Sequence, residues 1–274
     1  MKQVGLSPAP IPSPAAPKGR LFLPQDDPSV PSPPARPSVR VRSSGSSARR
    51  RNMRAPDREM AILEEAVRFF AEHGFEGQTR ELAKRMGITH SAIYRHFPSK
   101  EALIERVYEH VYLSRWSPDW EGLIRDRSRT VEQRLTQFYL EYARRVFDFH
   151  WVRIFVFSGL KSFDITKRYL AIVKKLIVVP ACIELRRELR LPGPEDIPVT
   201  EREEELIWGL HGRVFYIAIR KFVYGTPIPE DLDEVIADAV RQFMTGTPPV
   251  LKTVLAEARA QMQARAAHTT PASA

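Results

Sequence analysis

Residues 86–103 read MGITHSAIYRHFPSKEAL, and this stretch decides the fold. Gly87 can adopt the positive φ that a tight turn needs, and Ser99 has the character of a helix N-cap. Between them, Ile93 and Phe97 are spaced so that a short helix buries both on one face. The polar residues then share the other side. That side is either an ordinary solvated face or a surface that meets a partner.

Two further helices are predicted before this one. Apolar residues recur at helical spacing over residues 62–70, and this helix should end near Gly74. Thr79 precedes a second short apolar pattern that includes Leu82, and it has the character of an N-cap. The chain therefore places two short helices in succession behind a longer one.

The spacing around Gly87 is typical of a helix-turn-helix. Ala83 lies four residues before the glycine and Ile93 lies six residues after it. A small side chain lets two helices cross closely, glycine forms the turn, and the later aliphatic residue fills the angle between them.

The outward side of the third helix carries groups that can contact DNA bases or phosphates. These residues are His90, Ser91, Tyr94 and Arg95. Residues 79–100 are also locally basic, by four charges. The charged residues in this segment are Arg80, Lys84, Arg85, Arg95 and Lys100 against Glu81 alone.

The net charge of the whole chain does not by itself indicate DNA binding. The chain has 274 residues and a formal net charge of +9, but residues 1–56 hold ten Lys or Arg against two Asp, so the remainder is close to neutral. The single cysteine, Cys182, excludes an intramolecular disulfide. No apolar run reaches the length of a membrane span, and the first residues lack the layout of a secretory signal.

Four segments are expected. Residues 1–55 are rich in Pro, Ser and Arg and should be disordered. Arg49–Arg51 within them form either a basic arm for DNA phosphate or part of a solvated tail, and translation starting at Met53 or Met60 is a third reading. Residues 56–112 should form the helix-turn-helix domain, residues 113–246 a second helical domain, and residues 247–274 a loose tail.

The second domain should be entirely helical, which makes the fold class all-α. Strand alternation and hairpin dipeptides do not appear, and breakers such as SPDW and RLPGPEDIP separate apolar periodic segments. Helices are expected near 100–115, 131–149, 152–162, 166–190, 201–224 and 231–245.

Residues 61–111 closely resemble the DNA-binding domain of the tetracycline-repressor (TetR) family, most specifically in the run GIT…IYRHFPSKEAL. The segment 75–82 is one residue shorter than the commonest family spacing. The resemblance implies a homodimer that binds a palindromic operator in double-stranded DNA, with a second domain that binds an effector.

The resemblance also implies roles for individual residues. Thr79, Arg80 and Thr89 would contact phosphates at helix starts, as would Lys100. His90, Ser91 and Ala92 would face the major groove, with Arg95 on the same exposed side. Tyr94 and His96 would contact the DNA backbone. The alternatives are that Tyr94 or Ala92 packs inside the domain and that His96 covers a neighbouring phenylalanine.

The helices near 201–224 and 231–245 each show apolar residues on more than one side, as expected for a four-helix dimer interface. The alternative is that they belong to the monomer core. An effector pocket is expected in the aromatic region that follows residue 138. Its candidate residues are Phe138, Tyr142, Trp151, Phe155 and His211, with His150 and Arg153 as further polar candidates.

The predicted function is a transcriptional regulator, specifically a repressor that a small molecule releases from DNA. The alternative is an architectural or protein-recruited DNA binder without a ligand. No metal site, cofactor motif or catalytic constellation is present in the sequence, so an enzyme is not expected. The expected location is the bacterial cytoplasm, in association with the nucleoid.

Overall fold

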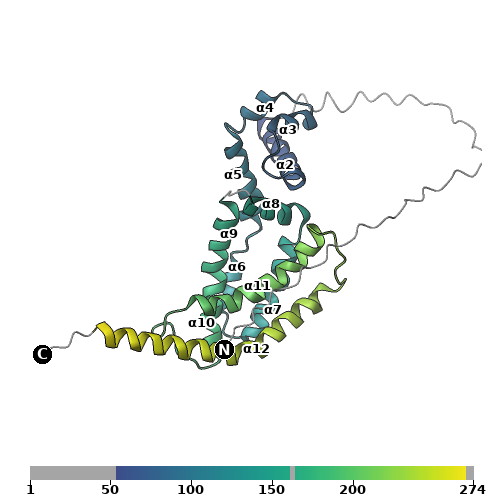
Figure 1. Ribbon diagram of the computed structural model, residues 1–274. Helices are drawn as coiled ribbons and strands as arrows, with labels where there is room; N and C mark the ends of the chain where they lie inside the picture. The colour runs from purple at the N-terminus through teal and green to yellow at the C-terminus, as the bar shows by residue number, and fades with distance from the viewer. Residues whose placement is uncertain (1–53, 161–163, 270–274) are drawn as a thin grey trace, which may run out of the picture. The chain divides into compact units, whose positions relative to one another are not determined.

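The structure is a computed structural model that describes residues 54–160 and 164–269 (Figure 1). Within these residues every regular element is helical, as the sequence predicted. The expectations for residues 1–53, including the Arg49–Arg51 arm, lie outside the described residues. None of the described helices combines the length and apolar character that crossing a membrane requires.

The first four helices form the expected helix-turn-helix domain. They are α2 (Ala55–His73), α3 (Thr79–Met86), α4 (His90–Tyr94) and α5 (Lys100–Val111). The inner face of α2 is buried and meets Ala83, Ile93 and Phe97, which are each at most 2% exposed. The residues that the helical spacing assigned to this small core therefore form it.

Gly87 makes the turn between α3 and α4. Its φ of 64° and ψ of 34° lie in the left-handed region, where a side chain would be strained. Its N–H donates to the carbonyl of Lys84 at 3.1 Å, and the next N–H, of Ile88, donates to that of Ala83 at 3.0 Å. These bonds satisfy carbonyls at the end of α3 and redirect the chain into α4.

The predicted helix starts are confirmed in one case and wrong in another. Ser99 caps α5 by accepting a hydrogen bond from the Ala102 N–H at 3.1 Å. The N-cap of α3 is Gln78, so Thr79 is the first helical residue and its side chain is buried. The one-residue shortening before α3 is the sequence signal for this shift.

The remaining helical segments follow one another along the chain. They are η1 (Leu113–Arg115), α6 (Asp119–Arg125), α7 (Val131–Val146), α8 (Phe149–Leu160), α9 (Ile165–Val173), η2 (Lys174–Val178), α10 (Val179–Glu188), α11 (Glu201–Phe222) and α12 (Leu232–Thr269). Helix α6 was not predicted, because Pro118 and the short length of the segment suggested a connection. Trp120 and Ile124 supply its buried face.

A π-type turn, η2, joins α9 to α10 without a break in the helical run. Pro180 follows it and has no N–H to donate to the preceding turn, so a regular α-helical ladder cannot continue through this point. The wider π turn accommodates the interruption. This explains why the predicted single helix near 166–190 is divided.

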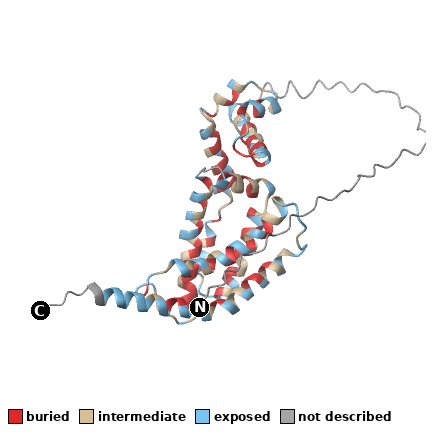
Figure 2. Cartoon of the chain, in the orientation of Figure 1, coloured by how far each residue is buried: buried red, intermediate tan, exposed pale blue. Residues whose placement is uncertain are grey.

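Helix α12 corrects the prediction of an end at 245 and a loose tail from 247. It continues through Pro248 and Pro249 to Thr269. Two interior prolines cost about 6 kcal/mol. Burial of Leu251, Val254 and Leu255 offsets this by about 1.5–3 kcal/mol each. Beyond these residues the helix is largely exposed (Figure 2).

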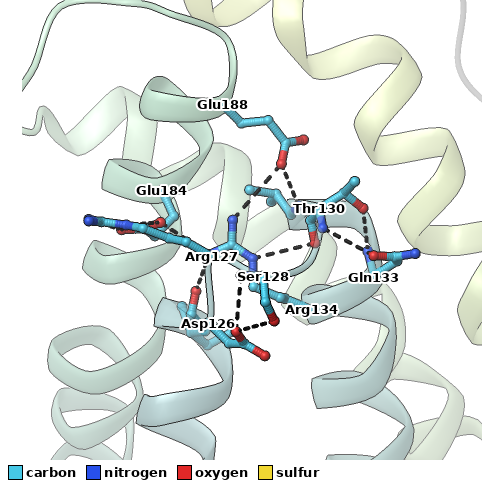
Figure 3. A network of polar contacts seen from close by, with 10 residues as sticks. Asp126, Arg127, Ser128, Thr130, Gln133, Arg134, Glu184 and Glu188 are labelled. Atoms are coloured by element: carbon cyan, nitrogen blue, oxygen red, sulfur yellow. Dashed lines mark hydrogen bonds and ion pairs between the residues drawn. The ribbon is translucent and has the colours of Figure 1, made fainter.

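A buried ionic network ties the start of α7 to α10 (Figure 3). Glu184 meets Arg127 Nη2 at 2.8 Å and Arg134 Nη1 at 3.1 Å. Arg134 also donates to the carbonyl of Ile124 at 2.6 Å. The hydrogen bond from Arg127 is the main reason that the pKa of Glu184 lies below its ordinary value.

A second buried ion pair holds the loop between α10 and α11. Arg186 Nε donates to Glu203 at 2.7 Å, and both side chains are almost wholly buried. The same guanidinium donates to the carbonyls of Ile197 at 2.5 Å and Pro198 at 3.3 Å. The Pro-rich loop is therefore tied down by one side chain.

Candidate functional site

The exposed side of α4 lies where the sequence predicted it, with one exception. Ser91 and Arg95 are exposed, and His90 and Tyr94 are half-buried. Ala92 is only 4% exposed. The low exposure of Ala92 favours the alternative that this residue packs inside the domain.

Thr79 holds two of the residues on α4. Its hydroxyl lies 2.9 Å from Nε2 of His90 and 3.1 Å from the hydroxyl of Tyr94. The rings of His90 and Tyr94 meet edge to face, with centroids 4.8 Å apart. Thr79 thus positions the side chains of His90 and Tyr94, and its hydroxyl is already hydrogen-bonded within the protein.

Thr89 and Ser91 stand at the exposed start of α4. Their hydroxyl oxygens are 3.1 Å apart, and both residues are exposed. Thr89 is the N-cap residue by backbone geometry, without a side-chain capping bond. The two hydroxyls form a small polar pair beside His90.

The basic charge around α4 is smaller than the sequence count. Arg85 pairs with Glu72 at 2.5 Å and with Glu65 at 2.5 Å, both on α2. This hydrogen bond from Arg85 lowers the pKa of Glu72. The cations that remain in the segment are Arg80, Lys84, Arg95 and Lys100.

His96 and Lys100 lie just after α4. Both are half-exposed, and Lys100 is the first residue of α5. The Ser99 cap fixes the start of this helix and with it the position of Lys100. The helix-turn-helix therefore presents polar and basic groups from the starts of two helices and from the outer side of α4.

The same segment matches a known family. A family model described as bacterial regulatory proteins of the tetR family matches residues 62–107, from α2 into α5. This part of the chain is similar to the DNA-binding domain of TetR-family regulators. These are regulatory proteins that bind DNA through a helix-turn-helix, which agrees with the prediction that the chain is not an enzyme.

A curated relative shares this part of the chain. The HTH-type transcriptional repressor AcnR of Corynebacterium diphtheriae is 51% identical over 47 residues. The match includes 17% of this chain and 25% of AcnR. The chain thus spans about a quarter of the length of this relative.

Solved structures extend the likeness in fold beyond the DNA-binding domain. Mycobacterium smegmatis AmtR has a TM-score of 0.50 and 19% identity, over 72% of this chain and 89% of AmtR. A mutant of HlyIIR has a TM-score of 0.50 and 17% identity, over 68% of this chain and 98% of HlyIIR. At these identities the likeness concerns the fold alone.

The predicted effector residues do come together in the second domain. Phe138, Tyr142, Trp151 and His211 are buried and Phe155 is half-buried. The ring centroids of Tyr142 and His211 are 5.1 Å apart, and those of Trp151 and Phe155 are 5.2 Å apart. Helices α7, α8 and α11 thus share one aromatic cluster.

Tyr139 and Tyr169 belong to this aromatic cluster and were not predicted. The centroid of Tyr139 lies 6.0 Å from that of His211, and the centroid of Tyr169 on α9 lies 5.2 Å from that of Trp151. Tyr139 lies three residues before Tyr142 on α7, so helical spacing was a usable signal. Tyr169 lies on the next helix after α8, and no local spacing rule pairs it with Trp151.

His150 and Arg153 lie away from the aromatic cluster. His150 is half-exposed and faces Asp148, with 3.7 Å between Nδ1 and Oδ1. Arg153 donates from Nε to the carbonyl of Ala71 on α2 at 2.6 Å. Both lie close to aromatic residues in sequence, but neither contacts the aromatic cluster through the bonds described here.

Helices α11 and α12 pack against each other, and their main apolar residues serve the monomer core. Ile207, Leu210 and Val214 on α11 are buried, as are Ile236 and Val240 on α12. The exposed side of α11 carries a different set. Its members are Gly209, Gly212 and Tyr216.

Proposed function

We propose that this chain is a homodimeric repressor that binds a palindromic operator and releases it when a small molecule binds the second domain. The observation that carries the proposal is the Thr79 hydroxyl joined to His90 and Tyr94. This arrangement holds the polar side of α4 in one orientation before any partner arrives, which favours a specific contact.

In this proposal, His90 and Ser91 contact base edges in the major groove. Tyr94, Arg95, His96 and Lys100 contact phosphates, together with Arg80 and Thr89 at the helix starts. Phosphate contacts set position and affinity, and base contacts set sequence preference. Thr79 acts through His90 and Tyr94.

The dimer is proposed to form through α11 and α12. A Cβ atom added at Gly209 or Gly212 would meet no atom within 4 Å. Glycine in a helix interior costs about 1 kcal/mol relative to alanine. Two such residues beside Tyr216, which is 52% exposed, suit the close approach of a second copy of α11.

Sedimentation analysis tests the dimer. Gly212→Leu places a large side chain on the proposed interface and should shift the protein toward monomers. Gly122→Leu is a matched control, because Gly122 lies in α6 and is equally open. A dimer that survives Gly212→Leu at micromolar concentration would move the interface elsewhere.

The effector is proposed to bind at the aromatic cluster of α7, α8 and α11. Helix α8 of this cluster contacts α2, and α11 is one of the proposed dimer helices. Binding there would bias the spacing of the two α4 helices in the dimer, since an effector acts through its preference for one geometry.

Selection from a random DNA pool tests the central claim. The full chain should enrich a motif with two-fold symmetry, whose half-sites lie about one helical turn apart or slightly more. His90→Ala and Ser91→Ala should relax the preference at one or two base pairs per half-site by about 1–3 kcal/mol. If neither substitution changed the enriched motif, His90 and Ser91 of α4 would not determine the base sequence that the protein recognises.

A further inference from the structure

The aromatic cluster contains buried polar atoms without partners. Among the described residues these atoms are the Tyr139 hydroxyl, Nε1 of Trp151 and Nδ1 of His211. Tyr139 and Trp151 are wholly buried, and His211 is 6% exposed. An unpaired buried donor loses its bonds to water and gains none in return, so native interiors contain few of them.

Other polar groups of the aromatic cluster do have partners, and the fourth unpaired buried atom in the described residues is Nε of Arg220 on α11. The hydroxyl of Tyr112, in the same aromatic cluster, donates to the carbonyl of Trp151 at 3.1 Å. The hydroxyl groups of Tyr142 and Tyr169 are hydrogen-bonded to each other. The aromatic cluster thus satisfies some of its polar groups and leaves three unpaired.

The three groups belong to one connected set of rings. His211 lies 6.0 Å from Tyr139 and 5.1 Å from Tyr142, measured between centroids. One turn further along α11, the centroid of Phe215 lies 5.9 Å from that of Trp151. Helices α7, α8 and α11 therefore direct three hydrogen-bonding groups into one aromatic environment.

Burial is the only influence on the pKa values of His211 and Tyr139, with no contribution from a charged side chain. It lowers the pKa of His211 to about 4 and raises that of Tyr139. At neutral pH the imidazole is therefore uncharged. A charged ligand would lose its hydration here, and neither His211 nor Tyr139 would offer an opposite charge in exchange.

We propose that this aromatic cluster binds an uncharged aromatic compound that carries hydrogen-bond acceptors. The acceptors receive the Tyr139 O–H and the Trp151 N–H, and the rings of the cluster contact the aromatic body. The inference rests on the proposed function, since it names the class of effector for that site. The rings of Phe155, Trp208 and Phe215 are half-buried, and in this proposal they move aside to admit the ligand.

Three single-ring probes test the ligand class with the full chain. Acetophenone is neutral and has a carbonyl acceptor, ethylbenzene lacks the acceptor, and benzoate is an anion. Saturation-transfer NMR titrations should show acetophenone binding at least about fivefold tighter than ethylbenzene, as expected for one good buried hydrogen bond. Benzoate should bind more weakly than both. Equal binding of acetophenone and ethylbenzene, tighter binding of benzoate, or no binding of any probe would overturn the inference.

Two conservative variants separate a ligand site from a structural cluster. Tyr139→Phe keeps the ring and removes an unpaired hydroxyl, so it should weaken acetophenone binding about three- to tenfold and leave ethylbenzene unchanged. Without ligand, this variant should melt at the same temperature as the parent or above it. Tyr112→Phe removes a hydroxyl that is already paired, so it should lower the melting temperature and keep the ratio of the two affinities. An unchanged ratio in Tyr139→Phe would contradict the role of this hydroxyl.

The two levels of the proposal fail in different ways. Probe binding as expected, with no enrichment of any DNA motif, would sink the proposed repressor function and support the ligand class. Enrichment of a palindromic motif, with no neutral probe bound, would support DNA binding and overturn the ligand class. Ordered water on the three groups would give the latter result.

Discussion

Arg153 on α8 donates from Nε to the backbone carbonyl of Ala71 on α2, at 2.6 Å. The guanidinium also lies 5.2 Å and 5.3 Å from the ring centroids of Phe149 and Phe157. One side chain of the second domain therefore holds the end of the first helix of the DNA-binding domain. The carbonyl of Phe222, at the end of α11, is 3.5 Å from Nη1 of the same residue.

Replacing Arg153 should loosen the junction between α2 and α8. Arg153→Met keeps the length of the side chain and removes the donors, so it should lower the free energy of unfolding by about 1–2 kcal/mol. Arg125→Met is the control, because the Arg125–Glu121 pair is exposed and such pairs contribute about 0–1 kcal/mol. Urea denaturation measures both variants. A smaller loss for Arg153→Met than for Arg125→Met would contradict the role of this junction.

Thr79→Val should weaken operator binding, although Thr79 acts on DNA only through His90 and Tyr94. The substitution keeps the shape of the side chain and removes the hydroxyl that joins His90 to Tyr94. We expect about a three- to tenfold loss of affinity and a stability loss of about 1 kcal/mol. The exposed hydroxyl of Thr89 is hydrogen-bonded to Ser91. Thr89→Val should therefore change the free energy of unfolding by less than about 0.5 kcal/mol. Binding to the selected operator and thermal unfolding check the two expectations.

Lys100→Ala should reduce the salt dependence of DNA binding. A lost phosphate contact flattens the slope of log affinity against log salt by about one unit, on the operator and on unrelated duplexes alike. Arg85→Gln provides the contrast, since Arg85 is committed to Glu65 and Glu72. Its slope should stay close to that of the parent. Equal slopes in the parent and Lys100→Ala would remove Lys100 from the phosphate contacts.

The protein should lose stability in mild acid through His211. The unfolded chain binds a proton near pH 6.5, whereas burial holds the folded pKa at about 4. As the pH falls from 6.5 toward 4, the unfolded state is therefore favoured, by up to roughly 3 kcal/mol. His211→Phe removes this contribution. Urea denaturation between pH 7.5 and 4.5 measures the free energy of unfolding of the parent and the variant. The difference between the two should be constant above pH 7. Below pH 6.5 the parent should lose stability relative to the variant. Parallel curves would contradict the assignment.

Local patterns predicted the DNA-binding half because its structure is local. The Gly87 turn, the Ser99 cap and the buried pair Ile93 and Phe97 each follow from a few neighbouring residues. What the patterns could not show were contacts across helices. Thr79 has the composition of a cap, yet its hydroxyl meets residues 11 and 15 positions later.

The second domain was less predictable for the same physical reason. Aromatic content indicated a cluster near Phe138 and Trp151, but Tyr139 and Tyr169 make their ring contacts with other helices, at His211 on α11 and Trp151 on α8. Helix α12 was misjudged because local proline costs were weighed without the burial of Leu251 and Leu255. The burial of these side chains against other helices stabilises α12 by more than its prolines destabilise it, and this burial cannot be seen in the segment alone.

The Arg186 contacts have a practical consequence for experiments on this protein. By composition, the loop after α10 resembles a flexible connector, and an engineer would choose it for a tag or a fluorophore. Its carbonyls at Ile197 and Pro198 are held by a guanidinium paired to Glu203, so an insertion there would disturb a buried charge. The exposed connection around Gly225, between α11 and α12, is the safer attachment point for a label.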